Sequence, residues 1–472
     1  MSESSEYLPT IGLEVHVELH TATKMFCGSI NDADEKRPNH NICPVCMAHP
    51  GTLPVINKKA VQYVLQVGAA IGAKLADYTE FDRKSYFYPD LPKGYQLSQY
   101  AYPLVSGGSL HGVSITRIHL EEDTARSQHD TKSNKTLIDY NRAGVPLMEL
   151  VTEPVLHTAE DAGAFARELQ ILLRTLGVSH ANMEKGEMRV EANISVSNKP
   201  GVLGTKVEVK NLNSFNSVEK AIAFEVKRHI EVLKSGGEIL QETRGWDENK
   251  QVAFAQRIKE GSADYRYFPD PDLPKLKLSE HPEFNKEAII ASLPELPVQI
   301  RARYSSYGIA AHDIETYLSD TTLRQFFETV ASSLEGEAKK IASNYITSDL
   351  MSLRSSQDIP VSPENFKALM LLVVEDKISS RGAKDVLKML VEDRRDPLTI
   401  AQEKGLLQVS DESALRAVVA DIVAQNPSVV LEYKSGKVQL LQFFVGQAMK
   451  ALKGAGNPKI LQQIVKEEVE KA

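Results

Sequence analysis

The chain has 472 residues, of which 25% are charged and 42% are hydrophobic, the balance of an ordinary soluble protein with two to four domains. A formal net charge of −8 argues against a protein that coats nucleic acid through overall charge, but it does not exclude RNA binding by a local basic patch. The sequence has no apolar run of membrane-spanning length, no signal peptide within Met1–Thr10 and no disulfide framework. We therefore expect a cytoplasmic protein that binds neither membranes nor DNA.

Strand-like runs, turns and a few helices are mixed in the first part of the chain, up to about Leu293. Polar and apolar residues alternate with period two over residues 11–19, 188–196 and 205–210. This pattern is typical of an antiparallel sheet with one dry face and one polar face. Because carboxylates stand beside cations at the polar positions, the sequence predicts a charged sheet surface.

Three helices are predicted within this region. One follows Thr158, carries an apolar stripe and stops at Gly177. The second covers residues 58–71, and the third follows Ser217.

The sequence after Pro294 and Pro297 reads almost wholly as helix, with a clear helix start at Ser362–Pro363. The composition shifts again near Gly405, and residues 434–466 contain six lysines and no acidic residue. These shifts predict three domains, at residues 1–293, 294–402 and 403–472.

Glu14 and His16 are metal-competent side chains on one face of a predicted strand, where they can reach one ion. Alone, such a pair is more often a surface glutamate and a histidine at the core edge. Further carboxylates nearby favour a metal site over that interpretation, because several acids in one cleft repel each other unless cations are bound. These carboxylates are Glu121, Glu122, Glu191 and Glu208. Oxygen-rich ligation with one imidazole suits Mg²⁺ or Mn²⁺.

Strict alternation, however, places Glu121 and Glu122 on opposite faces unless a strand end or bulge intervenes.

The sequence contains no Walker A motif and no GxGxxG that follows a strand. ATP would therefore have to be held by carboxylate-bound metal and scattered basic side chains. The basic candidates are Arg83, Lys84, Arg142 and Lys210.

Residues 81–90 interleave basic and aromatic side chains, Tyr86 and Tyr88 among them, and residues 264–272 have a similar composition. Aromatic faces beside cations suit the unpaired end of an RNA or a nucleotide base. A packed, proline-bounded loop is the competing interpretation.

Cys43 and Cys46 form half of a zinc knuckle, and Cys27 is a third candidate ligand. Ser29 occupies the position where a fourth thiolate would fall. The other candidates for a fourth ligand are His40 and His49, whose spacing is not diagnostic. Buried free thiols are the competing interpretation.

Several long motifs, in the same order along nearly the whole chain, are similar to those of the B subunits of aspartyl/glutamyl-tRNA amidotransferases, the GatB family. They cover residues 11–19, 119–123, 139–149, 210–216, 241–244 and 264–269. The resemblance implies an α+β fold whose antiparallel cradle domain is similar to glutamine synthetase and guanido kinases. An all-α domain and a small YqeY-like tail domain would follow. The tail would contact tRNA, and its candidate residues in this chain are Lys450 and Lys453.

The resemblance also implies an ATP- and Mg²⁺-dependent ligase that is active within a complex. The family phosphorylates the side-chain carboxylate of misacylated Glu-tRNA(Gln) or Asp-tRNA(Asn), and ammonia then displaces the phosphate. An amidase, the A subunit, supplies the ammonia, and a small C subunit straps the two together. The family's metal and catalytic positions fall on Glu14, His16 and Glu122, and its adjacent acidic positions on Glu121, Glu191 and Glu208. Many members carry a four-cysteine zinc site, from which this chain departs at Ser29.

Two rival functions are a non-catalytic tRNA-binding scaffold and a metal-dependent hydrolase that acts alone. A scaffold has no use for clustered acids in front of an anionic RNA. A metallopeptidase-like hydrolase is disfavoured because the sequence has no HExxH motif. The carboxylate–histidine set therefore discriminates among the three functions.

Overall fold

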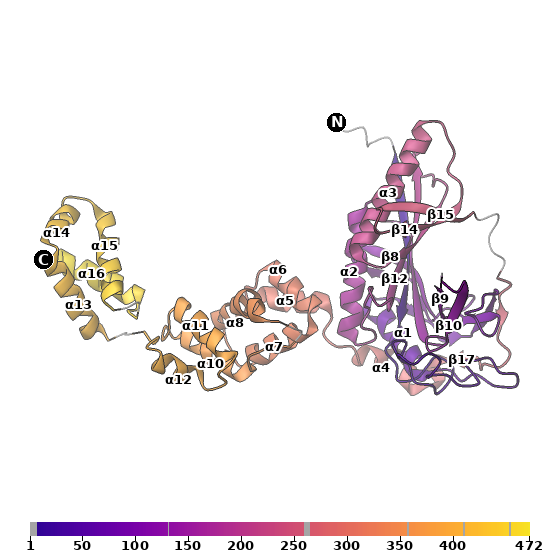
Figure 1. Ribbon diagram of the computed structural model, residues 1–472, viewed down its shortest axis with the longest axis horizontal. Coiled ribbons are helices and arrows are strands. Elements are labelled where there is room, and N and C mark those ends of the chain that lie inside the picture. The colour runs from indigo at the N-terminus through magenta and orange to yellow at the C-terminus, as the bar shows by residue number, and fades with distance from the viewer. Residues whose placement is uncertain (1–6, 131, 259–264, 356–357, 409–410, 453–454) are drawn as a thin grey trace. The chain divides into compact units, whose positions relative to one another are not determined.

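The computed structural model describes residues 7–472 except 131, 259–264, 356–357, 409–410 and 453–454. Two predicted residues, Asp264 of the last family motif and Lys453 of the tail, lie outside the described residues. The chain divides into two compact units, Met1–Pro297 and Val298–Ala472 (Figure 1). The finer division into three domains stays a prediction.

The first unit is built on a large sheet. Among the described residues it has ten strands, in the order β15-β14-β13-β12-β1-β11-β8-β6-β2, with β7 paired to β8. The strands are β1 (Leu8–Glu18), β2 (Lys74–Leu75), β6 (Val105–Ser106), β7 (Ser109–Leu110), β8 (Val113–Glu122), β11 (Pro146–Thr152), β12 (Met188–Ser197), β13 (Val207–Leu212), β14 (Glu242–Asp247) and β15 (Val252–Ile258). All pairs are antiparallel except β13 with β14.

The parallel pair is a departure from the predicted antiparallel sheet. Helix α3 (Phe215–Lys234) lies between β13 and β14 in the sequence. A helical crossover of this length can return the chain to the same edge, so that the next strand runs in the same direction. The result is a mixed sheet in an α+β unit, with antiparallel pairing dominant.

The predicted alternation in β1 and β12 is confirmed. Leu13, Val15 and Val17 are at most 1% exposed, whereas Glu14 and His16 are half-buried on the other face. Because the side chains of a strand alternate, one face of the sheet joins the core and the other collects the polar groups.

Helices α1 (Lys58–Ala70), α2 (Ala159–Leu176) and α3 pack on the apolar face, and α2 and α3 lie side by side along it (Figure 1). Helix α2 begins and ends as predicted, since Thr158 accepts from the Asp161 backbone N–H and Gly177 has φ +68°. Helix α3 begins at Phe215, earlier than predicted, because Ser214 is its N-cap.

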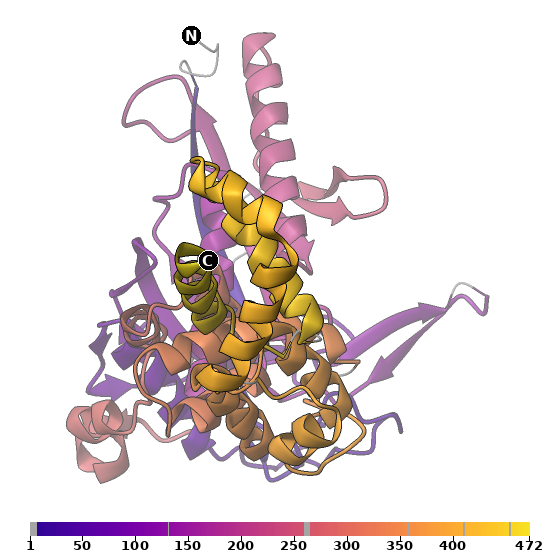
Figure 2. The same ribbon diagram turned by 90° about the vertical axis from the view of Figure 1, so that its left-hand side faces the viewer.

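Short strands and helices complete the first unit. They are β3 (Tyr78–Thr79) with β17 (Leu276–Lys277), β4 (Asp82–Ser85) with β5 (Tyr95–Ser98) and β16 (Phe268–Pro269), β9 (Arg126–Asp130) with β10 (Lys135–Asp139), α4 (Lys286–Ala291), and the 3₁₀ turns Leu278–Glu280 and Pro282–Phe284. The β9–β10 hairpin stands out from the large sheet (Figure 2).

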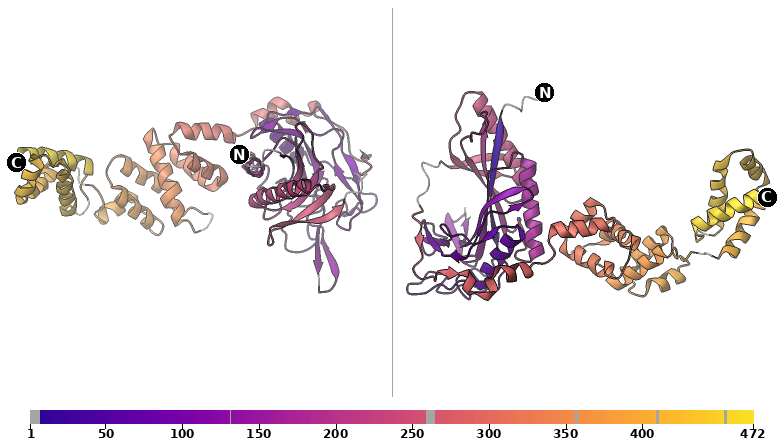
Figure 3. Two further views of the ribbon diagram at one scale, coloured as in Figure 1. Left: turned by 90° about the horizontal axis from the view of Figure 1, so that it is seen from above. Right: turned by 180° about the vertical axis from the view of Figure 1, so that it is seen from behind.

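The second unit is helical in its described part, as predicted (Figure 3). Its helices are α5 (Pro297–Ser306), α6 (Ala311–Ser319), α7 (Thr321–Ala331), α8 (Glu337–Asn344), the π-helix Tyr345–Leu350, α9 (Met351–Leu353), α10 (Pro363–Val374), α11 (Ser380–Leu390), α12 (Pro397–Glu403), α13 (Glu412–Gln425), α14 (Pro427–Lys434), the 3₁₀ turn Val438–Leu440, α15 (Leu441–Ala451) and α16 (Pro458–Lys471). Helices α13, α15 and α16 share a buried apolar cluster that runs from Leu415 to Val469.

No single helix in the described part of the chain is long and apolar enough to cross a membrane, although the bent pair α13 and α14 passes that test by length and composition together.

Candidate functional site

The polar positions of five neighbouring strands fall on one face of the large sheet, opposite the helices. The strands are β13, β12, β1, β11 and β8. Two groups of ligand-competent side chains form there, and within each group one ligand atom per residue lies within 4.8 Å of the others. The first group, the three-glutamate group, is Glu14, Glu191 and Glu208, and the second, the histidine group, is His16, Glu121 and Glu149.

Strand register creates the three-glutamate group. Glu14 lies directly opposite Glu191, and Glu208 lies opposite Asn193 on the next strand. Lys210 Nζ is 2.7 Å from Glu191 Oε2 and 3.2 Å from Glu208 Oε1. Burial and the neighbouring charges of Glu149 and Glu191 raise the pKa of Glu14, although Asn193 Nδ2 donates to it at 2.8 Å. Three carboxylates thus converge within reach of one another and of Lys210, an arrangement that suits a bound cation.

The histidine group lies beside the first. His16 Nε2 is 3.5 Å from Glu149 Oε2 and 3.7 Å from Glu121 Oε1, and His119 Nε2 is 3.3 Å from Glu149 Oε2. Burial alone would lower the pKa of His16, but the hydrogen bond to Glu149 and the charges of Glu149 and Glu121 raise it to about 9. Glu121 Oε2 is buried without a hydrogen-bond partner among the described residues, and Lys84 Nζ lies 4.0 Å away. An imidazole with carboxylate oxygens, one of them unsatisfied, fits Mg²⁺ or Mn²⁺.

Sequence reasoning missed Glu149 as a site residue, although it ends one of the family motifs. Its signal was a lone carboxylate in the apolar run of β11, where Met148 and Leu150 on either side are fully buried. A charged residue in the middle of a buried strand requires polar partners, and His16 and His119 supply them.

The structure does not bring Glu122 to either group, contrary to the prediction. Consecutive residues of β8 point to opposite faces, and no bulge separates Glu121 from Glu122. Glu122 Oε1 instead accepts from Lys93 Nζ and, at 3.0 Å, from the Leu97 backbone N–H. Together with Lys93 and Cys27 it lines a separate cavity of about 270 Å³.

Of the predicted basic residues, some lie at the two carboxylate groups and others lie elsewhere. Lys84 reaches the histidine group and Lys210 the three-glutamate group. Arg83, next to Lys84, points elsewhere and binds Asp270 at 2.6 Å. Arg142 Nε lies 3.6 Å from Asp123 Oδ2 and donates to the Thr124 carbonyl. The structure thus places two of the four basic candidates at the carboxylate groups.

Asp123 and Glu18 continue the polar face beyond the histidine group. Arg189 Nη2 is 3.0 Å from Asp123 Oδ2. Burial and the charge of Asp123 raise the pKa of Glu18 to about 8, against the charges of Arg189 and Arg142. The family motif at residues 119–123 includes Asp123, but the sequence did not predict its pairing with Arg189.

A row of tyrosine rings lies next to Lys84. Tyr88 and Tyr86 have ring centroids 6.0 Å apart, and Tyr86 and Tyr265 are also 6.0 Å apart. Tyr265 and Tyr267 are 6.0 Å apart, and Tyr267 stacks on Tyr100 at 4.4 Å. Lys84 Nζ lies 5.1 Å from the Tyr265 centroid. This tyrosine row joins Tyr86 and Tyr88 of the first aromatic stretch to Tyr265 and Tyr267 of the second, and it also includes Tyr100. Tyr88 and Tyr100 are exposed, and Tyr86 is half-buried.

Lys450, the described residue of the predicted tail contact, is exposed on α15 of the second unit.

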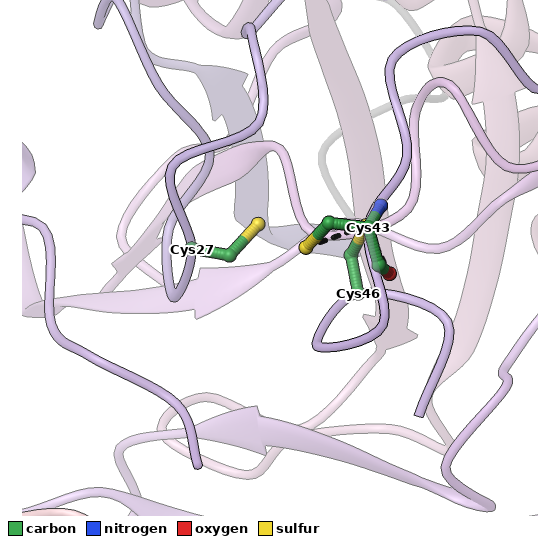
Figure 4. Close-up of side chains that lie close together, drawn as sticks. All are labelled: Cys27, Cys43 and Cys46. Atoms are coloured by element: carbon green, nitrogen blue, oxygen red, sulfur yellow. Dashed lines mark hydrogen bonds between the residues drawn. The ribbon is translucent and has the colours of Figure 1, made fainter. Parts of the chain in front are cut away.

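The three cysteines lie together, as the half-knuckle predicts (Figure 4). Cys46 Sγ is 3.9 Å from Cys43 Sγ and accepts from the Cys43 backbone N–H at 3.1 Å. A hydrogen bond from Cys27 and the charge of Lys24, against burial, lower the pKa of Cys46 to about 5. Two thiolates on one tetrahedral zinc ion are about 3.8 Å apart, given a Zn–S distance near 2.3 Å. The sulfur spacing therefore fits a shared ion rather than a disulfide. Neither His40 nor His49 belongs to this group in the described chain.

Comparisons with known proteins cover nearly the whole chain. Residues 9–282 match the GatB/GatE catalytic domain, and residues 325–469 match the GatB domain. Relatives named as the B subunit of aspartyl/glutamyl-tRNA(Asn/Gln) amidotransferase include one from Gloeothece citriformis, 40% identical over 99% of this chain and 98% of its own. Another, from a Thermoanaerobacter species, is 42% identical over 99% of this chain and 100% of its own. A third, from Persephonella marina, is 42% identical over 98% of this chain and 99% of its own. A solved tRNA-binding domain of glutaminyl-tRNA synthetase from Saccharomyces cerevisiae aligns with 37% of the chain at 14% identity and a TM-score of 0.26, a likeness too weak to carry an argument.

Proposed function

Because this chain belongs to the GatB family of amidotransferase B subunits, we propose that it is the subunit that activates and amidates an amino acid on tRNA. Its substrate would be the side-chain carboxylate of a misacylated Glu-tRNA(Gln) or Asp-tRNA(Asn). ATP phosphorylates that carboxylate, and ammonia converts it to the amide of Gln-tRNA(Gln) or Asn-tRNA(Asn). The observation that carries the proposal is the pair of carboxylate groups on one sheet face, each with a lysine at its side.

Activation is needed because a carboxylate is a poor electrophile whose leaving group would be oxide. Transfer of a phosphoryl group from ATP gives an acyl phosphate, from which ammonia displaces phosphate. Two anions must meet in the first step, so positive charge has to be concentrated there. The three-glutamate group and the histidine group would hold Mg²⁺, and the bound ion would supply most of that charge.

The lysines contribute charge of their own. Burial would lower the pKa of Lys84, but the charge of Glu121 raises it well above its ordinary value. The charges of Glu191 and Glu208 do the same for the pKa of Lys210. Both side chains therefore stay protonated at neutral pH and can orient phosphate oxygens.

We infer that the tyrosine row receives the unpaired 3′ end of the tRNA. Bases stack on aromatic faces regardless of their sequence. Lys84 contacts both Tyr265 of the row and Glu121 of the histidine group, so the row lies next to the carboxylates. Tyr86 and Tyr88 keep their predicted role in this proposal, and Lys450 keeps its role as a contact to the tRNA body.

We further infer that the ammonia comes from another chain. The cysteines of the sequence are all in the sulfur cluster, where none is paired with a histidine in the described chain, so none resembles a glutaminase nucleophile. An A subunit with amidase activity and a small C subunit would complete a cytoplasmic heterotrimer. The likeness of the first unit to glutamine synthetase and guanido kinases belongs to the same proposal.

A non-catalytic scaffold is the alternative, and the polar face argues against it. RNA carries one negative charge per nucleotide, and a surface of clustered glutamates repels it unless cations are bound.

The test is amidation by the reconstituted complex with Glu-tRNA(Gln), ATP, Mg²⁺ and ammonium chloride, which bypasses glutamine hydrolysis. Glu14→Gln should lower the rate by about 100-fold or more while tRNA binding is retained. Glu231→Gln, an exposed position on α3, is the matched control. A wild-type rate for Glu14→Gln would refute the proposed site.

A further inference from the structure

The motif at residues 241–244 borders the three-glutamate group, although it contributes no carboxylate to that group. Its strand, β14, pairs with β13 in parallel, and Thr243 lies directly opposite Glu208. Thr243 is buried, and its Oγ1 donates to Glu208 Oε2 at 3.0 Å. A hydrogen bond is directional, so a buried hydroxyl restricts the rotation of the carboxylate that accepts from it. The motif therefore contacts the candidate cation site through the side chain of Thr243.

The next residue of β14 points to the opposite face of the sheet, which the helices cover. Arg244 Nε lies 3.0 Å from Oε1 of Glu225, a fully buried residue of α3. The Nη1 atom of Arg244 contacts Glu242 Oε1 at 2.6 Å, and its Nη2 donates to the Ala253 carbonyl of β15 at 2.9 Å. Arg244 thus connects β14 to a helix on one face of the sheet and to the strand beside it.

These contacts matter because the ladder between β13 and β14 is short. It runs from the pair Glu208 and Thr243 to the pair Lys210 and Gly245. Parallel pairing is also slightly less stable per residue than antiparallel pairing. The contacts of Arg244 therefore help to hold β14 in its register, and this register places Thr243 beside Glu208.

The two carboxylate oxygens of Glu208 have different partners. Thr243 holds Oε2, whereas Oε1 lies 3.2 Å from Lys210 Nζ. The same Nζ lies 2.7 Å from Oε2 of Glu191, so Glu208 Oε1 is on the side of the other glutamates. Carboxylates that bind metals are commonly oriented by hydrogen bonds from side chains that do not themselves touch the ion.

We propose that Thr243 is a positioning residue of the three-glutamate group, whose hydroxyl orients the carboxylate of Glu208 for a divalent cation. Thr243 acts through Glu208 and does not itself bind the cation. The inference rests on the proposed function, because Glu208 belongs to the proposed Mg²⁺ site. It extends that site by one strand, from β13 to β14.

The test is Mn²⁺ binding to the full-length chain, freed of metal and followed by the electron paramagnetic resonance of the free ion. Mn²⁺ accepts the same oxygen ligands as Mg²⁺, and its binding is measured without turnover. Glu208→Gln identifies the binding step that belongs to the three-glutamate group. Thr243→Val keeps the branched shape and removes the hydroxyl, so it should weaken that step by about 10-fold. Thr243→Ser keeps the hydroxyl and should bind within about 3-fold of wild type.

A double variant separates positioning from a general structural effect. If Thr243 acts through Glu208, adding Thr243→Val to Glu208→Gln should cause no further loss of affinity, whereas independent effects would add. Thr116→Val is the matched control. Thr116 is an exposed threonine of β8 whose Oγ1 donates to Glu153 Oε1 at 2.7 Å, a bond of the same kind outside the site. Its loss should leave Mn²⁺ affinity unchanged.

The outcomes distinguish this role from the proposed function. Wild-type affinity in Thr243→Val, loss of binding in Thr243→Ser, or full additivity in the double variant would overturn the positioning role and leave the proposed function standing. A wild-type chain that binds no Mn²⁺ would overturn the cation site and the role together. If circular dichroism shows that Thr243→Val does not fold, Thr243→Ala takes its place with the same expected loss.

Discussion

The charge of the polar face depends on which cations contact its carboxylates. In the three-glutamate group, Lys210 contacts both Glu191 and Glu208. In the histidine group His16 is held between Glu121 and Glu149. A single substitution or a bound ion in either group therefore changes the local charge and shifts the pKa values of the remaining side chains.

The first prediction concerns Lys210→Met. Without the ammonium, three carboxylates face one another, so the free energy of unfolding in chelator should fall by about 1 kcal/mol. Millimolar Mg²⁺ should restore more stability to the variant than to the wild type, because the ion replaces the missing charge. Urea unfolding with and without Mg²⁺ measures both effects. Lys227→Met, an exposed lysine on α3, is the control. An equal response of Lys210→Met and wild type to Mg²⁺ would contradict the cation-site assignment.

The second prediction concerns pH in the metal-free protein. The pKa of His16 is about 9 in the folded chain and about 6.5 when unfolded, so the folded state holds the proton more tightly. Its stabilising contribution is complete below about pH 6.5 and is lost as the pH rises through about 9. Wild type should exceed His16→Gln by up to about 3 kcal/mol near pH 6, and the difference should vanish near pH 10. A difference that grows with pH in urea unfolding would show that His16 is not held protonated by Glu149.

The sequence was informative about these residues where alternation alone decides the face. Glu14, His16, Glu191 and Glu208 all lie on the predicted polar face. The partners of each residue were not predictable, since they depend on which strands become neighbours. Glu149 was missed because β11 lies between β1 and β8 through long-range pairing, which the sequence pattern does not show.

Secondary-structure elements were predicted well where local chemistry sets their limits. Thr158 and Ser362 cap helices at the predicted starts, and Asn57 caps the helix predicted from residue 58; each side chain accepts from the backbone of the first turn. The parallel pairing of β13 with β14 was not predictable from alternation, because the direction of a strand follows from the connection that precedes it.

Strand β8 yields the third prediction, since Glu121 and Glu122 leave it on opposite faces. Glu121→Gln should weaken Mg²⁺ binding by about 10-fold or more, because it removes a buried carboxylate from the histidine group. Glu122→Gln should leave Mg²⁺ affinity within about 2-fold of wild type, since Glu122 faces Lys93 in the separate cavity. Calorimetric titration of the two variants with Mg²⁺ compares them directly. Equal losses would mean that both carboxylates reach one ion, as the sequence alone predicted.

The whole chain joins a mixed α+β unit, which carries the carboxylate groups and the tyrosine row, to a helical unit. In the proposed function the first unit handles the aminoacyl end of the tRNA, and the second contacts the body. A chain with an overall charge of −8 can bind RNA in this way only through local basic positions.

The fourth prediction tests the second unit. Lys450→Glu should weaken tRNA binding and reduce the slope of log affinity against log salt by about 1, because one phosphate contact is lost. Lys286→Glu, at an exposed lysine on α4 of the first unit, serves as the control. Filter binding over a salt series gives both slopes. An unchanged slope in Lys450→Glu would remove Lys450 from the tRNA contact.

The central claim is that the polar face transfers a phosphoryl group to the side-chain carboxylate of the aminoacyl-tRNA. The most direct test charges tRNA(Gln) with glutamate labelled by ¹⁸O in its side-chain carboxylate and follows the label during amidation by the complex. If an acyl phosphate forms, the oxygen that bridges carbon and phosphorus leaves with phosphorus, so the released inorganic phosphate carries one ¹⁸O per amide formed. Mass spectrometry of the phosphate should show this label in the wild type, and Glu14→Gln should slow the formation of labelled phosphate and of amide together, by about 100-fold or more. Unlabelled phosphate beside a normal yield of amide would contradict the account.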